Sequence, residues 1–300
     1  LVGERFADRY LVDAILGEGG MGRVYRAVEE GMDRAVALKV LHPLRIADWT
    51  QVRRFFGEAR AASRLSSPHV VRVFAFGVDE GRRLPFIVME LLVGETLADT
   101  LRRAPLTPRR LAAVLAQVAQ ALTEAGDAGI VHRDLKPSNI FLANAAGPDH
   151  VKVMDFGVAK DLGRTDSGAD ALTQTGQALG TPAFMAPEQL MGADIDPRAD
   201  LYALGCLVHV GLTGRPPFAA RDTAVLVGRH LAEPAPRLPD EVGGEVVPPR
   251  LHRLYKTLMA KRPEQRPASA HVVLKELTAI ARGEADGPQP MDLSTPYLES

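Results

Sequence analysis

The chain has 300 residues, 46% of them hydrophobic, which is enough for one large domain or two lobes with a sizeable core. Its 36 basic and 37 acidic residues nearly cancel, so neither a nucleic-acid-binding surface nor a polybasic membrane patch is indicated. These values favour a globular enzyme that contacts neither nucleic acid nor membrane. The single cysteine, Cys206, excludes an internal disulfide and lies in an apolar run, so we expect it to be buried.

The sequence opens without a signal peptide and contains no run of about 18 or more uncharged apolar residues. One cysteine is also compatible with a reducing cytosol. We therefore expect a cytoplasmic chain. It begins with Leu rather than Met, which suggests a fragment, and a full-length protein anchored in a membrane beyond either end is compatible with this expectation.

Residues 8–41 are predicted to form strands joined by tight turns. Gly17, Gly19 and Gly22 match the pattern Gly-x-Gly-x-x-Gly, in which the missing Cβ atoms let the backbone approach phosphate oxygens. Dinucleotide-binding folds use the same pattern, but there the third glycine opens a helix, whereas residues 24–28 alternate like a strand. A β-hairpin over a phosphate is favoured. A glycine-rich turn without a ligand is the alternative for this motif taken alone.

Lys39 lies inside an apolar strand, where a lysine is costly to bury without a partner. Glu58 is the candidate partner because it belongs to a helix predicted over residues 49–65. Contacts between Glu58 and neighbouring arginines are the alternative. The helix is predicted from apolar residues at helical spacing, namely Val52, Phe55, Phe56 and Ala59.

Two further strands are predicted at residues 70–74 and 85–89, and the segment 90–94 follows them. Thr107 and Pro108 indicate the start of a helix, with the threonine hydroxyl as N-cap, and this helix is expected to end near residues 126–129. Additional elements are predicted in the rest of the chain. They are a hairpin of 141–143 and 151–154, a buried helix at 200–208, and helices at 222–231, 250–260 and 269–281, the last with Ser269 as N-cap.

Residues 131–139 read Val-His-Arg-Asp-Leu-Lys-Pro-Ser-Asn and place an acid, a base and an amide on one short loop. Pro137 lacks an N–H group and resists continuing a helix, so a pinned loop is predicted. The segment resembles the catalytic loop of the protein kinase family, His-Arg-Asp-Leu-x-x-x-Asn, at every specified position. Asp155-Phe156-Gly157 and Ala186-Pro187-Glu188 match the two borders of a kinase activation segment.

The resemblance implies an α+β, two-lobed protein kinase fold. A small β-rich N-lobe with one key helix would span about residues 8–92, and a larger, mostly helical C-lobe about 93–282, within a kinase domain at 1–282. Residues 283–300 contain glycines, prolines and few apolar residues, so we interpret them as a linker or disordered tail.

The resemblance also implies the roles of individual residues in ATP-dependent phosphoryl transfer. Asp134 would be the catalytic base, Lys136 would reach the γ-phosphate, and the Thr181 hydroxyl would bridge these two. Asn139 and Asp155 would hold Mg²⁺, with Mn²⁺ as an alternative. Glu188 and Arg266 would form a structural pair, and Asp200 would also be structural. The implied ATP-binding residues are Gly17, Glu18, Gly19, Gly20, Met21, Gly22, Val24, Ala37, Lys39, Glu58, Met89, Glu90, Leu92 and Phe141.

By the same resemblance, residues 90–94 would form the hinge between the lobes. Met89 would gate the back of the nucleotide pocket, and the Glu90 carbonyl and Leu92 N–H would bind the adenine edge. Thr96 stands about where many eukaryotic kinases use an acid to hold the ribose, so that contact is not implied for this chain.

The 34 residues from Asp155 to Glu188 lack sustained periodicity, as expected of a functional loop. In similar kinases an arginine and a lysine, here Arg133 and Lys160, receive a phosphate on this segment. Thr173 and Thr175 are the candidate phosphorylation sites, with Thr165 and Ser167 as weaker ones. Polar residues of a loop without this role are the alternative interpretation.

Lys136 and Thr181 are typical of serine/threonine rather than tyrosine kinases, and the composition resembles the eukaryotic-like kinases of bacteria. The expected activity is therefore that of a non-specific serine/threonine protein kinase. Its partners would be protein substrates, a second copy during autophosphorylation, and a homodimer through the N-lobe. A pseudokinase scaffold and, with less support, a small-molecule phosphotransferase are the alternative functions.

Overall fold

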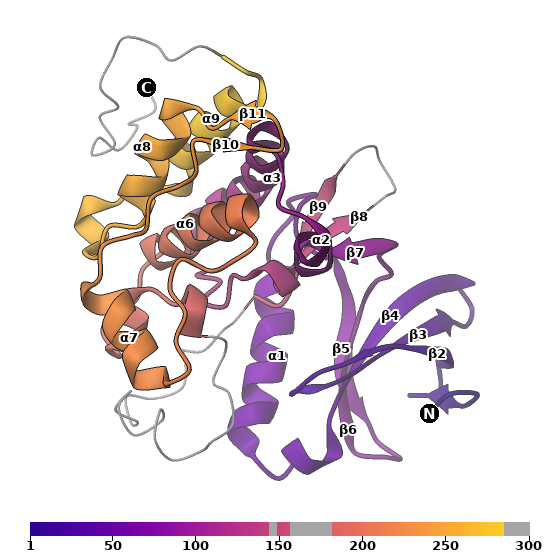
Figure 1. Cartoon of the computed structure of the whole chain (residues 1–300). Coiled ribbons are helices and arrows are strands. Elements are labelled where there is room, and N and C mark those ends of the chain that lie inside the picture. Colours follow the sequence, from indigo (N-terminus) through magenta and orange to yellow (C-terminus); the bar gives the residue numbers. More distant parts are fainter. Residues whose placement is uncertain (144–148, 157–181, 285–300) are drawn as a thin grey trace, which may run out of the picture.

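The N-terminal part of the chain forms an antiparallel sheet with strand order β1-β2-β3-β4-β6-β5. The computed structural model describes residues 1–143, 149–156 and 182–284, and Figure 1 shows the sheet beside a larger helical region. The strands are β1 (Arg5–Phe6), β2 (Tyr10–Glu18), β3 (Gly22–Glu29), β4 (Arg34–Leu41), β5 (Val73–Asp79) and β6 (Leu84–Glu90).

Helix α1 (Trp49–Ser63) is the long helix that packs on β5 and β6 of the sheet. Asp48 caps it by accepting a hydrogen bond from the Thr50 N–H, as a short polar N-cap side chain does. Successive residues of a strand point to opposite faces, so Leu38 and Val40 join a core on one face while Leu41 joins Phe55 of α1 on the other. Lys39 has the same parity as Leu41 and is directed toward α1.

The C-terminal part is mostly helical. Helices α3 (Pro108–Asp127) and α6 (Arg198–Thr213) are rich in buried hydrophobic residues and form the centre of its core, and α3 also packs against α9 (Ala270–Ala281). The other helices are α2 (Leu97–Arg103), α5 (Pro187–Leu190), α7 (Thr223–Ala232) and α8 (Pro249–Leu258), with 3₁₀ turns η1 (Pro43–Arg45), η2 (Pro137–Asn139), η3 (Pro182–Phe184) and η4 (Pro263–Gln265).

Two small sheets complete the C-terminal part. Strands β7 (Gly94–Thr96), β8 (Ile140–Ala143) and β9 (His150–Val153) form an antiparallel sheet next to α2 (Figure 1). Strands β10 (Glu241–Val242) and β11 (Glu245–Val246) form a short hairpin. None of the helices in the described part of the chain has the length and apolar character needed to cross a membrane.

Most predicted elements are present, including the strands within residues 8–41, the helix that carries Glu58, and the hairpin before Asp155. Cys206 is fully buried, as expected. The strand predicted at 70–74 is wrong in position: β5 starts at Val73, and Val70 instead forms an isolated parallel bridge with Val153. The apolar run was interpreted as one strand, but its first residues pair with a distant strand.

Other differences concern elements and caps that the sequence pattern did not reveal. The sheet begins at Arg5, before the expected start at residue 8, and neither α2 nor the β10–β11 hairpin was predicted. Thr107 and Ser269 occupy the N-cap positions, but neither side chain makes the expected capping hydrogen bond. Pro108 nevertheless occupies the first helical position of α3, where its missing N–H group is not needed. Residues 144–148, which join the predicted hairpin, and residues 285–300 of the predicted tail lie outside the described residues.

Replacing Gly22 by alanine should destabilise the sheet, because a Cβ there would lie 2.1 Å from the Val40 carbonyl oxygen. We expect the free energy of unfolding to fall by about 1–3 kcal/mol, the usual cost of overpacking. Gly20→Ala is the matched control, since no atom lies within 4 Å of its added Cβ. Urea denaturation of both variants tests this, and equal stability of the two would contradict it.

Candidate active site

The loop at 131–139 is held in place by a buried carboxylate from helix α6. Asp200 accepts hydrogen bonds from the backbone N–H groups of His132 at 2.7 Å and Arg133 at 2.9 Å. Burial raises the pKa of Asp200 above its ordinary value, although the two N–H groups work in the opposite direction. Arg133 adopts a left-handed backbone conformation with φ of 65°, which a non-glycine residue keeps only where its surroundings fix it.

The fully buried ring of His132 links this loop to the strand end that carries Asp155. Its Nε2 lies 2.9 Å from the Met154 carbonyl oxygen, and its Nδ1 lies 3.3 Å from the Asp134 backbone N–H. With the Nδ1 accepting from this N–H, the Nε2 is the ring nitrogen that can donate to the Met154 carbonyl. The ring also packs on Phe156 at 4.6 Å between centroids.

The side chains of Lys136 and Asn139 both donate hydrogen bonds to the carboxylate of Asp134. The Lys136 Nζ donates to the Asp134 Oδ2 at 2.7 Å, and the Asn139 Nδ2 donates to the same oxygen at 3.2 Å and to the Asp134 backbone oxygen at 2.8 Å. Turn η2 brings Asn139 back to Asp134, with a backbone hydrogen bond from the Asn139 N–H to the Lys136 oxygen. The arrangement orients one carboxylate next to one ammonium group.

Lys39 makes ion pairs with two carboxylates from distant parts of the chain. Its Nζ lies 3.2 Å from the Glu58 Oε2 on α1 and 2.7 Å from the Asp155 Oδ1 that follows β9. Burial alone would lower the pKa of Lys39, but the two carboxylates outweigh it and raise the pKa above its ordinary value. Lys39 is therefore charged in this site, and the alternative of Glu58 pairing with surface arginines is not what the structure contains.

The two carboxylates respond differently to this shared lysine. Burial raises the pKa of Glu58, and Lys39 only partly offsets that effect. At Asp155 burial also acts to raise the pKa, but Lys39 outweighs it and holds the pKa below its ordinary value. Asp155 has a left-handed backbone with φ of 55°, so its side chain leaves β9 at an unusual angle.

The donor set of Asn139 and Asp155 fits a hard divalent cation. Because the Asn139 Nδ2 is bonded to Asp134, the remaining amide atom available to a metal is the Oδ1 oxygen. Across the described ranges, no group of three or more His, Cys, Asp or Glu residues is arranged to bind a metal. A cation here would take one carboxylate, one amide oxygen and further oxygens from phosphate or water, as Mg²⁺ prefers.

The glycine-rich turn between β2 and β3 is closed by two backbone hydrogen bonds between Gly19 and Gly22, at 2.9 and 3.2 Å. No atom lies within 4 Å of a Cβ built at Gly17, Gly19 or Gly20, so these positions leave open space. Gly22 differs, because it is required by contact with β4. The missing Cβ atoms therefore leave open space at Gly17, Gly19 and Gly20, and at Gly22 they allow close packing of the strands.

The other expected nucleotide-binding residues lie on adjoining strands. Val24 of β3 is opposite Lys39, and Ala37 of β4 is opposite Met89 of β6. Phe141 lies on β8, opposite Thr96. The strand β6 ends at Glu90, and Leu92 lies in the following irregular segment. Glu18 is the last residue of β2, and Met21 belongs to the exposed glycine-rich turn.

Glu188 and Arg266 form the expected buried pair, with two hydrogen bonds of 2.6 and 2.8 Å. Arg266 also donates to three backbone carbonyls, those of Arg198, Ala260 and Lys261. Every polar end of this guanidinium is therefore used, which is the condition under which a buried charge is tolerated.

Sequence reasoning missed Gln189, which follows this glutamate. Its Nε2 donates to the Arg133 carbonyl at 2.9 Å, and its Oε1 accepts from the Ala186 N–H at 3.0 Å. It therefore joins the loop at 131–139 to the start of α5. Its position at N3 of a short helix, typical of a capping residue, was the available signal.

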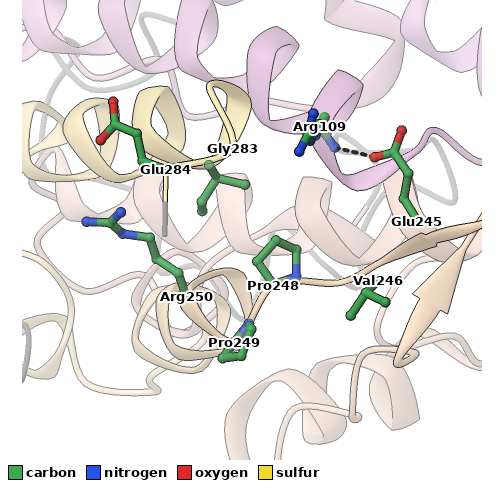
Figure 2. Close-up of a pocket in the computed structure, with 9 residues that line it drawn as sticks. Arg109, Glu245, Val246, Pro248, Pro249, Arg250, Gly283 and Glu284 are labelled. Carbon is green, nitrogen blue, oxygen red and sulfur yellow. Dashed lines mark hydrogen bonds between the residues drawn. The ribbon is translucent and has the colours of Figure 1, made fainter. Parts of the chain in front are cut away.

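Thr181, Lys160, Thr173 and Thr175 lie outside the described residues, so their expected contacts are not part of the site as described. A cavity of about 430 Å³ lies elsewhere, at the far end of the helical region. Figure 2 shows Arg109 and Glu245 on its walls, where the Arg109 N–H donates to the Glu245 Oε2 at 3.3 Å. It shares no residue with the site above.

The sheet and the helical region meet at a lysine–carboxylate pair, and a glycine-rich turn and an acid–amide loop complete the site. This combination defines a phosphotransferase of protein kinase type. Comparison with known families agrees: the model described as "Protein kinase domain" matches residues 10–277. The chain belongs to this family.

The curated relatives found include two bacterial proteins named serine/threonine-protein kinases. Pkn3 of Myxococcus xanthus is 42% identical over 285 residues, covering 93% of this chain and 51% of Pkn3. PknL of Mycobacterium tuberculosis is 39% identical over 274 residues, covering 91% of this chain and 66% of PknL. The chain thus spans about half to two thirds of the length of these relatives.

Among solved structures, the kinase domain of Mycobacterium tuberculosis PknI is similar, with a TM-score of 0.69 at 28% identity. The similarity covers 93% of this chain and 98% of that one. The two-lobed kinase fold expected from the sequence is therefore confirmed.

Removing Arg266 should strongly destabilise the C-lobe, because Arg266→Met leaves the Glu188 carboxylate buried and unpaired. We expect a loss of about 3–5 kcal/mol in the free energy of unfolding, measured by urea denaturation. Arg198→Met is the matched control: its ion pair with Asp196 is partly exposed, so its loss should cost about 1 kcal/mol or less. Similar losses in the two variants would count against the role of burial.

Proposed function

We propose that the chain transfers the γ-phosphate of Mg-ATP to serine and threonine hydroxyls of proteins. The observation that carries this proposal is the meeting of Lys39, Glu58 and Asp155 in one ion-pair cluster beside the Asp134 loop. These parts match the needs of phosphoryl transfer, in which the protein mainly positions the reactants and neutralises charge. The names of the curated relatives support the serine/threonine specificity.

In the proposed reaction, the hydroxyl oxygen of the substrate forms a bond to the γ-phosphorus, the bond from that phosphorus to the β–γ bridging oxygen breaks, and ADP leaves. Asp134 accepts the hydroxyl proton, and Lys136 sits beside it to neutralise the γ-phosphate oxygens. Lys39 binds the α- and β-phosphates while Glu58 fixes its position. Mg²⁺ held by Asn139 and Asp155 supplies further charge neutralisation when bound.

The nucleotide would lie between the glycine-rich turn and the strands that follow Lys39. Val24, Ala37 and Phe141 would contact the adenine faces, Met89 would limit the depth of the pocket, and the backbones of Glu90 and Leu92 would bind its edge. The turn residues Glu18, Gly19, Gly20 and Met21 would cover the phosphates. Val24, Ala37 and Met89 already lie on paired strands, which supports this arrangement.

A pseudokinase scaffold is the second candidate function, from a class that transfers no phosphate. All five residues expected to act on ATP are present, and they form two groups: Lys39 with Glu58 and Asp155, and Asp134 with Asn139. Their presence favours an active enzyme. A small-molecule phosphotransferase is disfavoured by the Ala186-Pro187-Glu188 segment, which is expected to shape a platform for peptides.

Asp134→Asn should lower phosphoryl transfer by about 100-fold or more, because a general base typically contributes that factor. Lys39→Met should also abolish transfer. The measurement is the intact mass of phosphatase-treated chain after incubation with Mg-ATP and a protein substrate. Asp149→Asn is the matched control, since this aspartate pairs with Arg110 on the surface and should leave transfer unchanged. Near-normal transfer by Asp134→Asn would refute the proposed role.

We also propose autophosphorylation of the activation segment at Thr173 or Thr175, with Arg133 and Lys160 receiving the phosphate and Thr181 bridging Asp134 and Lys136. The expected result is phosphate on Thr173 or Thr175 in peptides from the active chain, lost in the Thr173→Ala/Thr175→Ala double variant. Thr165→Ala/Ser167→Ala serves as the control in the same segment. Phosphate on neither Thr173 nor Thr175 would rule out this assignment.

That the full-length protein phosphorylates protein substrates is part of the same proposal, because this chain spans only part of the length of its relatives. We assign residues 1–282 to the kinase domain and 283–300 to a linker. A homodimer through the N-lobe and a cytoplasmic location of the domain are further proposals, as is an anchor in a longer protein.

A further inference from the structure

We propose that the ion pair between Glu90 and Lys152 positions the hinge between the lobes and thereby sets the affinity for the adenine of ATP. The proposal rests on the function proposed above, because only that function assigns adenine to the Glu90 backbone. It concerns the side chain of Glu90 and a lysine that has no assigned role so far. Both act through the backbone and are positioning residues.

Glu90 makes hydrogen bonds through both its backbone and its side chain. Its N–H donates to the Arg72 carbonyl at 2.9 Å, and its side-chain Oε1 accepts from the Arg72 N–H at 2.8 Å. The same Oε1 accepts from the Lys152 Nζ at 2.7 Å. One carboxylate oxygen therefore joins the segment before β5, the end of β6 and the middle of β9.

The pair is shielded from solvent. The side chain of Lys152 is 13% exposed and that of Glu90 is 24% exposed, so salt screens their attraction less than it screens a surface pair. The N-lobe and C-lobe meet here, because β6 belongs to the large sheet and β9 to the small sheet of the helical region. An ion pair across two lobes restricts their relative rotation.

Strand β9 is itself fixed on both sides of Lys152. Val153 exchanges backbone hydrogen bonds with the segment before β5, donating to the His69 oxygen at 2.7 Å and accepting from the Val71 N–H at 3.0 Å. Lys152 thus presents its ammonium from a rigid base, three residues before Asp155. The consequence is that the hinge end of β6 is held relative to the strand that leads into the metal-binding residue.

Loss of the Lys152 charge would leave the end of β6 held by Arg72 and by its pairing with Val36 of β4, but without its ion pair to β9. The hinge backbone could then shift relative to β9, and the groups expected to bind adenine would be less well placed. The cluster of Lys39 and Glu58 shares no residue with this pair, so phosphate binding should be affected much less. The inference therefore predicts a selective loss of adenine affinity.

The experiment compares Mg-ADP with Mg-tripolyphosphate, which has phosphates but no adenine, by isothermal titration calorimetry. For Lys152→Met we expect the affinity for ADP to fall about tenfold and that for tripolyphosphate to fall less than about twofold, a size typical of coupled neighbours. Lys152→Arg should retain ADP affinity. In kinetics, KM for ATP should rise in Lys152→Met while kcat is preserved.

Arg110→Met is the matched control, because Arg110 pairs with Asp149 directly before β9, the strand that carries Lys152, and has no part in the Glu90–Lys152 pair. Glu90→Gln, which keeps an acceptor for the Arg72 N–H, is the second variant if Lys152→Met does not fold. Equal weakening of both ligands, or no weakening of ADP, would overturn the inference while the function stands. A parent chain that binds ADP no better than tripolyphosphate would overturn both.

Discussion

A buried ammonium group is the constraint on which the rest of this structure depends. Lys39 sits in a strand between two hydrophobic cores, and its charge is tolerable only because Glu58 and Asp155 reach it from a helix and from the other lobe. One carboxylate comes from within the sheet region and the other from beyond the hinge. The need to neutralise one charge thus fixes α1 against the sheet and holds the two lobes together in the described conformation.

The residues of the candidate site could be predicted from the sequence for two reasons. Burying a charge without a partner costs free energy, and the residues of the loop lie close together in the sequence. A lysine in an apolar strand demands a partner, and an Asp and an Asn five residues apart around a proline predict a loop that returns on itself. Both pairs are present in the structure, as is Glu188 with Arg266.

What the sequence did not predict depends on contacts between distant segments. Residues 70–72, Val-Val-Arg, belong to a run with the composition of a strand, but their backbone groups pair with Val153 and Glu90, and no local pattern indicates this. Gln189 and the side chain of Glu90 likewise act through backbone atoms far along the chain. Helix α2 was missed because it is short and its capping box, Thr96 with Asp99, follows a segment interpreted as hinge.

The packing of α3 on α9 bears on the order in which the chain can fold during synthesis. These helices are separated by more than 140 residues, so α3 emerges from the ribosome long before its partner exists. The large sheet, whose strands all lie before residue 91, has no such delay and can form as a unit first. Segments β9 and α6 can cover part of α3 earlier, but the face that α9 covers stays exposed until the last helix of the domain has been synthesised, and exposed apolar surface of this kind is prone to aggregation during folding.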